Sequence, residues 1–341
     1  MAPGYVAEGV GPRRWTQFLE YDEASHYRAL EFIRRYRAPE TASGRAGSEH
    51  DTSRRTPGAA EAERRPFMLT VSYHHPHEPF NPPQEYWDLY EDADIPVPSI
   101  PENIDEIRTQ MDRWLHRFHG LHTKDITDTE SLRTLQRAYY ALVTYVDHLV
   151  GELVTELDRQ GLLDSTVVVF SSDHGEMLGA REMIQKRTFY EQSVRVPLIV
   201  AFPDGRGAGT TVDTPVTLVD LLPTFTDLAG VSRDLLVEPD GDSLLPLCDG
   251  AADEWYANRC VFSEYHSEGV YAPCFMARRG RDKYVLIHGH ERQLFDLGSD
   301  PEEWTNLAGS PEHTDVEAAL EKAILDKIGR ASCRERVCHR V

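Results

Sequence analysis

One segment constrains the fold of this chain more than any other: a short, almost continuously apolar strand that leads into a polar turn. Thr166–Phe170 reads Thr-Val-Val-Val-Phe, the pattern of a strand covered on both faces in a parallel sheet. Pro197–Phe202 has the same character. Before the first strand, Ser131–Gln160 carries leucines and valines at threes, fours and sevens, which predicts a long amphipathic helix that Gly161 ends. Strands of this kind alternating with helices predict an α/β domain.

The first part of the chain is expected to be helical and then to lose its apolar residues. Residues 1–40 form an N-terminal helical part, in which Tyr27, Leu30 and Ile33 are predicted to face a core. Residues 41–66 contain no Val, Ile, Leu, Met, Phe, Tyr or Trp. Such a segment cannot bury enough apolar surface to offset the entropy of ordering, so we expect a flexible insertion.

The remaining chain divides into a core, a smaller subdomain and a tail. The α/β core is expected over residues 67–250, where a helix at Leu218–Ala229 begins with Asp220 as its N-cap. Residues 251–327 change to short strands joined by turns, which predicts an antiparallel subdomain with strands at Val261–Tyr265, Cys274–Arg278 and Lys283–His288. Residues 328–341 resemble the translation of a DNA-sequencing adapter, so we expect an artefactual tail there.

Composition restricts the partners and the compartment. The formal charge of −21 argues against nucleic acid and against an anionic membrane surface, both of which attract basic patches, and it tolerates a cationic ligand. No apolar run approaches the ~20 residues of a membrane span. The first residues have neither a basic nor an apolar stretch, so we expect a cytoplasmic protein. Outside the tail, Cys248, Cys260 and Cys274 show no CxxC spacing and are predicted to be ordinary thiols.

The turn after the buried strand is the first candidate site. Asp173 and His174 lie at the carboxyl end of the strand, where ligands bind in open α/β sheets, and Gly175 allows a tight backbone turn. A carboxylate beside an imidazole suits a divalent cation. The same residues also fit a helix N-cap followed by a polar turn, and the three residues alone do not decide between the two interpretations.

Two further segments carry candidate residues. Lys186 is either a solvated surface charge or, in a pocket with a cation, a point charge for an anionic oxygen. Tyr73–Pro79 places three histidines in four positions after a predicted strand, Phe67–Tyr73. A histidine-rich loop can be a metal site, a set of surface imidazoles or the position of a proton donor, and spacing alone selects none of them.

Taken in order, these segments resemble the sulfatase branch of the alkaline-phosphatase-like superfamily, and within it the choline-sulfatase group. The motifs that match are Val71–Pro79, Ser172–Gly175, Met177–Gly179, Lys186, Phe189–Leu198, Val219–Thr224, Glu264–Gly269, Leu294–Leu297 and Asp300–Glu303. The resemblance covers about Pro12 to Ile328 apart from Thr41–Pro66. It implies an α/β sandwich with a mixed, largely parallel central sheet flanked by helices, plus a small C-terminal antiparallel subdomain.

The resemblance also implies a chemistry and a role for each residue. Sulfatases hydrolyse sulfate esters with a formylglycine nucleophile and a divalent metal. By motif position Asp173 and His174 are then metal ligands, with Ca²⁺ as the expected ion. Lys186 contacts the sulfate and takes part in catalysis. His77 faces the bridging ester oxygen and protonates the leaving choline, a poor leaving group, and His75 on the same loop is the rival for that role.

The chain departs from the family pattern in two places. It contains no Cys/Ser-x-Pro-x-Arg motif, from which formylglycine is made, and no N-terminal strand ending in Asp-Asp. The resemblance therefore implies an N-terminally truncated fragment that is inactive alone, derived from an enzyme that hydrolyses choline O-sulfate and tends to form homo-oligomers. The alternatives are a phosphonate monoester or phosphodiester hydrolase of the same superfamily and a non-catalytic remnant.

Overall fold

The structure is a computed structural model. It describes residues 9–36, 66–121, 128–232, 235, 239–251 and 254–338, with side chains up to residue 328. The chain forms two compact units, each described by itself. The first unit comprises residues 1–95 and 133–167, and the second comprises residues 96–132 and 168–341. The insertion predicted over residues 41–66 lies outside the described residues apart from Pro66, and the predicted domain boundaries stay predictions.

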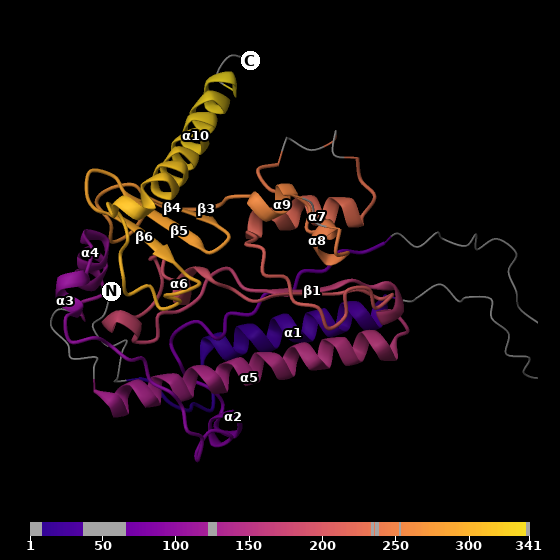
Figure 1. The fold of residues 1–341 in the computed structure, drawn as a ribbon. Helices are drawn as coiled ribbons and strands as arrows, with labels where there is room; N and C mark the ends of the chain where they lie inside the picture. Colours follow the sequence, from indigo (N-terminus) through magenta and orange to yellow (C-terminus); the bar gives the residue numbers. More distant parts are fainter. Residues whose placement is uncertain are drawn as a thin grey trace, which may run out of the picture. The chain divides into compact units, whose positions relative to one another are not determined.

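Two helices that run side by side and parallel form the frame of the first unit (Figure 1). They are α1, Gln17–Arg35, and α5, Thr129–Arg159. Three side-chain hydrogen bonds join them: Glu23 to Tyr145 at 3.0 Å, His26 to Glu152 at 2.8 Å, and Arg34 to Glu156 at 3.1 Å. The residue numbers rise together along both helices, so the helices run in the same direction.

The amphipathic pattern of the long helix is confirmed, and that of the first helix is confirmed only in part. Leu135, Leu142 and Leu149 of α5 are buried, and Gly161 follows the helix with a φ of +65°. In α1, Ile33 is buried as predicted, but Tyr27 is 63% exposed. The expectation for Tyr27 is wrong because the buried stripe of α1 runs through Leu19, Asp22, His26, Ala29 and Ile33, so His26 is buried where Tyr27 was expected.

The buried face of α5 gives a direct test of this packing. Leu142 has no exposed surface, whereas its neighbour Val143 is 43% exposed. We expect Leu142→Ala to lower the free energy of unfolding by about 2–5 kcal/mol, since it removes buried methyl groups and leaves a cavity. Val143→Ala is the matched control and is expected to change it by at most about 0.5 kcal/mol. Urea unfolding of both variants measures the difference, and equal effects would contradict this orientation of α5.

The remaining helices are short, except the last. The first unit contains α2, Gln84–Asp88, and η2, Leu163–Ser165. The second unit contains α3, Ile104–Ile107; α4, Gln110–Phe118; η3, Ala180–Glu182; α6, Glu191–Val194; η4, Leu218–Asp220; α7, Leu221–Leu228; α8, Leu245–Cys248; α9, Glu254–Asn258; η6, Pro311–His313; and α10, Thr314–Cys338. Asp220 directly precedes α7, but its side chain makes no cap bond to that helix and instead accepts a hydrogen bond from the Thr217 N–H at 2.9 Å.

The two apolar strands pair with each other in the second unit. β1, Val168–Ser171, lies antiparallel to β2, Leu198–Ala201, with Val168 opposite Ala201. The expectation of a parallel sheet covered on both faces is therefore wrong for these two strands. They pair antiparallel, β1 is half-buried, and Ile199 of β2 is 60% exposed, because an apolar run fixes neither the direction of pairing nor the covering of both faces. Phe67–Tyr73, predicted as a strand, is not one in the structure, since it joins no ladder among the described residues.

The C-terminal part of the second unit is an antiparallel sheet in the order β3-β4-β5-β6. Its strands are Val261–Tyr265, Cys274–Arg279, Asp282–Ile287 and Arg292–Asp296, so the predicted antiparallel subdomain is confirmed and β6 is an additional strand. Successive residues of β4 and β5 point to opposite faces. One face packs on a cluster that includes Met276 and Val285, and the other packs on α10 through Ala277 and Tyr284.

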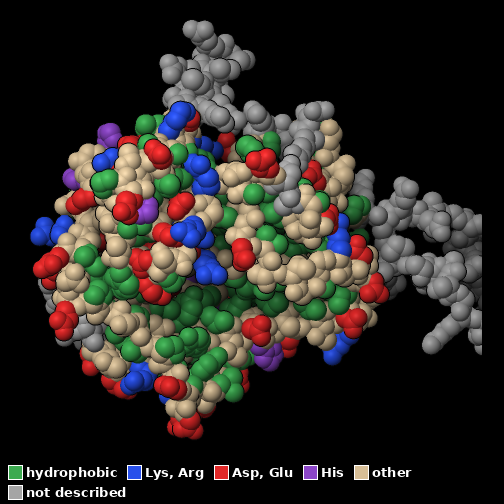
Figure 2. Space-filling model, in the orientation of Figure 1, with side chains coloured by type: hydrophobic (Ala, Val, Ile, Leu, Met, Phe, Trp, Pro, Cys, Tyr) green, Lys and Arg blue, Asp and Glu red, His purple; other side chains and the backbone are tan. Residues whose placement is uncertain are grey.

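The surface carries both signs of charge. On the face shown in Figure 2, acidic and basic side chains are interspersed. Among the described residues, no helix combines the length and the apolar character that crossing a bilayer requires.

Candidate functional site

The Asp173–Gly175 turn directly follows β1. The carboxylate of Asp173 is 85% exposed, and its Oδ1 accepts a hydrogen bond from the backbone N–H of His174 at 3.0 Å. The Nδ1 of His174 lies 2.8 Å from the carbonyl oxygen of Gly175. A carbonyl only accepts, so Nδ1 carries the hydrogen, and Nε2 is the acceptor nitrogen of the neutral ring. This nitrogen lies 3.7 Å from Oδ2 of Asp173.

Helix α6 holds the turn through backbone bonds. The N–H groups of Gly175 and Glu176 each donate at 2.8 Å, to the carbonyl oxygens of Ser193 and Gln192. A Cβ atom at position 175 would lie 2.0 Å from the Gln192 carbonyl oxygen. Glycine is required at position 175 because the backbone of α6 approaches this closely.

A looped segment returns Lys186 to the same turn. The N–H of Met177 donates to the carbonyl of Gln185 at 2.8 Å, and the N–H of Gln185 donates to the Glu176 carboxylate. Lys186 is therefore fastened beside the turn although it lies twelve residues further along the chain than His174. Glu176, which the sequence reasoning did not single out, closes this loop.

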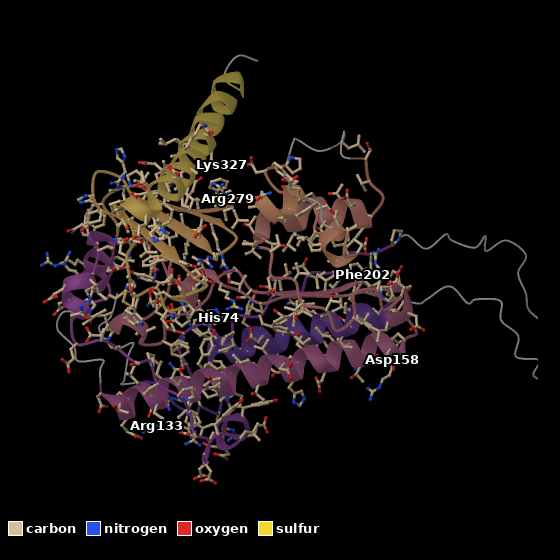
Figure 3. All side chains as sticks on the ribbon, viewed as in Figure 1. His74, Arg133, Asp158, Phe202, Arg279 and Lys327 are labelled. Atoms are coloured by element: carbon tan, nitrogen blue, oxygen red, sulfur yellow. The ribbon has the colours of Figure 1, made fainter. Side chains whose placement is uncertain are left out.

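Asp173, His174 and Lys186 line one pocket of the second unit. The pocket has a volume of about 1420 Å³, above the ~300–1,000 Å³ that is common for small-molecule sites. The rest of its lining includes β2, the segment that follows β2 and begins at Phe202, labelled in Figure 3, and β3. It also includes Glu191 of α6 and Arg278 of β4. The pocket therefore joins a carboxylate, an imidazole and an ammonium group to a lining that is partly apolar and partly polar.

Two side chains of this pocket have the chemistry of metal ligands. Asp173 supplies an exposed carboxylate, and His174 has its Nδ1–H fixed by a carbonyl, the arrangement that orients histidines bound to metals through Nε2. The described residues contain no group of three or more His, Cys, Asp or Glu side chains arranged to hold a metal ion. The two side chains thus fit a cation as two of its ligands.

The histidine loop belongs to the first unit, and a buried aspartate of α1 holds it. Asp22 has a fully buried side chain and accepts hydrogen bonds from the backbone N–H groups of His74 at 2.6 Å and His75 at 3.3 Å. It also accepts one from Nδ1 of His75, at 2.6 Å. His74, labelled in Figure 3, stacks on Phe18 of α1 with ring centroids 3.9 Å apart. The start of the loop is therefore fixed to α1.

The second and third histidines of the loop, His75 and His77, differ in burial. The side chain of His75 is fully buried, and its Nε2 makes no hydrogen bond to the described residues. The side chain of His77 is 33% exposed. Its Nδ1 lies 2.8 Å from the carbonyl oxygen of Glu78, so that nitrogen carries a hydrogen. Nε2 is then the acceptor nitrogen of the neutral His77 ring.

The structure brings three of the five predicted site residues together and places the other two on one loop. Asp173, His174 and Lys186 share the pocket of the second unit, and His75 and His77 share the loop of the first. Asp22 was missed, although it stands on the buried stripe of α1, where a charged residue is unusual. That position was the signal that would have identified it.

Comparison with known proteins identifies the family. The family model described as "Sulfatase" matches residues 20–231, which includes the histidine loop, the Asp173–Gly175 turn and Lys186. The chain belongs to the sulfatase family. A second model, described as "N-sulphoglucosamine sulphohydrolase, C-terminal", matches residues 179–330 of this sulfatase, and so includes the antiparallel sheet and most of α10.

Similar proteins include sulfatases and a phosphonate hydrolase. The chain is 41% identical to the choline-sulfatase of Rhizobium meliloti over 256 residues, which is 74% of this chain and 48% of that protein. It is 31% identical to an arylsulfatase of Clostridium perfringens, covering 77% of this chain and 54% of that one. The phosphonate monoester hydrolase of Silicibacter pomeroyi superposes with a TM-score of 0.66 at 29% identity, over 76% of this chain and 55% of that structure.

Two facts follow from these comparisons. The chain is a choline-sulfatase-like sulfatase with the alkaline-phosphatase-like α/β fold. It spans about half the length of the curated relatives it matches.

Proposed function

We propose that this sulfatase hydrolyses choline O-sulfate to choline and sulfate, as part of a complete enzyme. Membership of the family and the similarity to choline-sulfatase support the reaction class and the substrate. The observation that carries the proposal is the pocket wall of the second unit, where Asp173, His174 and Lys186 stand together. A bound cation and an ammonium group in one pocket would suit the anionic sulfate group that is transferred when choline leaves.

In this proposal the pocket residues bind and neutralise the sulfate group. Asp173 and His174 hold a divalent cation, and we propose Ca²⁺, which supplies a positive charge for the sulfate oxygens. Lys186 places a second positive charge near the same oxygens. The loop bonds that fasten Gln185 to Glu176 and Met177 keep the lysine at this position.

The histidine loop supplies the proton in this proposal. As the bond between sulfur and the bridging oxygen breaks, Nε2 of His77 gives its proton to the choline oxygen, which leaves as an alcohol. The bond from Nδ1 of His77 to the Glu78 carbonyl keeps the ring oriented during this step. We assign His75 a supporting role, because its side chain is fully buried on Asp22.

The nucleophile lies outside the 341 residues in this proposal. The chain contains no Cys/Ser-x-Pro-x-Arg motif, so we expect the formylglycine to come from sequence upstream of it. The purified chain alone is then expected to release no sulfate from choline O-sulfate.

The experiment uses the gene together with its upstream sequence. Extending the reading frame upstream is expected to reveal the motif, and the extended enzyme is expected to release choline and sulfate from choline O-sulfate. Lys186→Met in the extended enzyme should abolish most of this activity. The substitution removes a positive charge that faces the transferred sulfate group, and such charges stabilise the transition state strongly. An extended enzyme that carries the motif but leaves choline O-sulfate intact would refute the proposal.

A phosphonate or phosphate diester is the second candidate substrate. The superposition on the phosphonate monoester hydrolase of Silicibacter pomeroyi favours it, because that protein shares the fold and 29% of the aligned residues. Comparing kcat/KM of the extended enzyme for choline O-sulfate and for an aryl phosphonate monoester separates the two. A higher value for the phosphonate would select this second candidate.

A further inference from the structure

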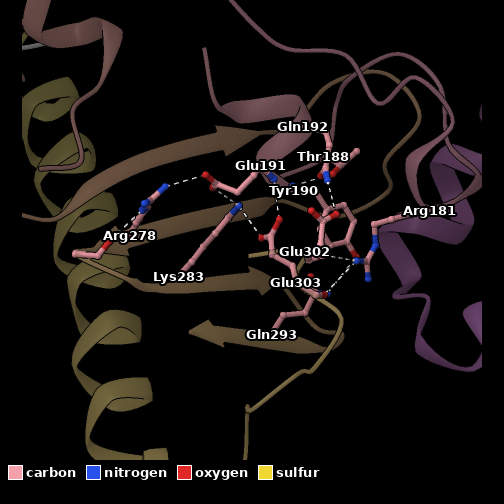
Figure 4. Close-up of polar contacts among 11 residues, drawn as sticks. Arg181, Thr188, Tyr190, Glu191, Gln192, Arg278, Lys283, Gln293, Glu302 and Glu303 are labelled. Carbon is pink, nitrogen blue, oxygen red and sulfur yellow. Dashed lines mark hydrogen bonds and ion pairs between the residues drawn. The ribbon is translucent and has the colours of Figure 1, made fainter. Parts of the chain in front are cut away.

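A cluster of charged side chains lies in the second unit (Figure 4), and two of its members, Glu191 and Arg278, line the same pocket as the predicted site residues. The side chain of Lys283, in β5, is fully buried, and its Nζ lies 2.9 Å from Oε1 of Glu191 and 2.7 Å from Oε1 of Glu303. Arg278, in β4, pairs with the other oxygen of Glu191 at 2.9 Å. Two cations and two carboxylates thus come from the sheet, from α6 and from the loop after β6.

The charges of this cluster depend on one another. Burial acts to raise the pKa of Glu191, but Lys283 and Arg278 outweigh it and leave that pKa below its usual value. Burial raises the pKa of Glu303, and here it outweighs the attraction of Lys283. Such a cluster is costly to assemble, and removing one member leaves the others buried without a counter-charge.

The cluster is directly connected to the turn that carries the predicted metal ligands. Glu191 is the first residue of α6, and its N–H also donates to Oε2 of Glu303 at 2.7 Å. The next two residues of α6 accept the backbone bonds of Gly175 and Glu176. The position of the Asp173–Gly175 turn is therefore set by α6, and the position of α6 is set by the cluster.

A second tether holds the loop that leads to Lys186. The guanidinium of Arg181 stacks on the rings of Tyr190 and Trp304 and donates to the carbonyl oxygens of Glu302 and Glu303. This loop has five non-glycine residues with positive φ, which are Leu178, Arg181, Glu182, Gln185 and Arg187. Backbone of this kind persists only where surrounding structure enforces it, and it concentrates at functional sites.

We propose that Lys283, Glu191 and Glu303 are positioning residues of this sulfatase, which hold the Asp173–Gly175 turn and the Lys186 loop in place from the C-terminal sheet. The role of the turn in binding the sulfate group rests on the proposed function. The series of contacts from the cluster through α6 to the turn does not depend on it. Lys283 and Glu303 do not line the pocket, so they then act on the site through α6.

The test measures the link without any turnover, in the full 341-residue chain. In Lys283→Met, amide hydrogen exchange at Gly175 and Glu176 is expected to accelerate by at least about ten-fold, since their acceptors on α6 lose their anchor. The amide of Ala229 in the second unit, which bonds to the Phe225 carbonyl at 2.9 Å, serves as the internal reference and should change much less. Lys322→Met is the matched control, because Lys322 pairs with Asp326 at a 73% exposed position.

Two outcomes would overturn the proposal. One is unchanged exchange at Gly175 and Glu176 in folded Lys283→Met, and the other is an equal acceleration at Ala229, which indicates a loss of overall stability only. Should Lys283→Met fail to fold, Glu303→Gln replaces it, since glutamine keeps an acceptor for the Glu191 N–H and removes the charge. The Glu303→Gln chain is expected to exchange about three-fold faster at the same two amides, and no acceleration there would refute the proposal. Because exchange needs no substrate, these results stand whatever ester the enzyme hydrolyses.

Discussion

Replacing His77 by alanine in the extended enzyme is expected to slow the hydrolysis of choline O-sulfate by about 10²–10⁴-fold, the usual contribution of a general acid. Choline leaves as an alkoxide unless it receives a proton, so the reaction depends strongly on a donor. The orientation of the His77 ring, with Nδ1 on the Glu78 carbonyl, leaves Nε2 to carry that proton. The measurement is kcat for choline O-sulfate.

A second ester separates proton donation from a loss of structure. An aryl sulfate with an acidic phenol leaves readily without a proton, so His77→Ala should slow its hydrolysis far less than that of choline O-sulfate. His288→Ala is the control for removing an exposed imidazole and should affect neither ester. Equal losses on the two esters would show that His77 is not the proton donor.

Gly175→Ala is expected to lower the free energy of unfolding by about 3 kcal/mol, at the upper end of what overpacking usually costs. The added Cβ would stand 2.0 Å from the carbonyl oxygen of Gln192, which is backbone and cannot rotate away. Either the turn or α6 has to move, and both of the backbone bonds between them are weakened. Chemical unfolding measures the loss of stability.

Gly151→Ala provides the opposite control. Gly151 lies in α5, and a Cβ there would meet nothing within 4 Å. The same substitution is therefore expected to stabilise the chain by roughly 0.5–1 kcal/mol, since alanine loses less entropy in a helix than glycine. A Gly175→Ala chain as stable as the parent would show that the turn and α6 are not in close contact.

Much of the fold could be predicted because its signals are local. The leucines of α5 recur regularly enough to define both the helix and its buried face, and Gly161 marks its end. The hairpin of β4 and β5 was predicted because two short apolar runs flank a turn that contains Gly280. The Asp173–Gly175 turn was predicted for the same reason, as a polar segment directly after an apolar strand.

The parts that could not be predicted depend on partners distant in sequence. The antiparallel pairing of β1 with β2 is a choice between directions that an apolar run does not encode. Lys283 and Glu303 look like ordinary surface charges in the sequence, and only the fold shows that they are buried against each other. The burial of Asp22 does not follow from Tyr27 and Leu30, because the buried stripe of α1 runs through His26 and Ala29 instead.

Side chains of β5 alternate between two faces of the sheet, so the length of the hairpin between β4 and β5 decides which of them faces Glu191. Lys283 faces Glu191, while the next residue, Tyr284, belongs to the cluster under α10. Arg279, labelled in Figure 3, and Asp282 face each other across a two-residue turn. Deleting one residue of that turn would shift β5 by one position and exchange the faces of the lysine and the tyrosine. Deleting a single codon of this surface turn would therefore place the phenol of Tyr284 beside the carboxylates of Glu191 and Glu303 and bury the ammonium group of Lys283 under α10. Selection for the pocket would therefore also keep the length of this hairpin constant.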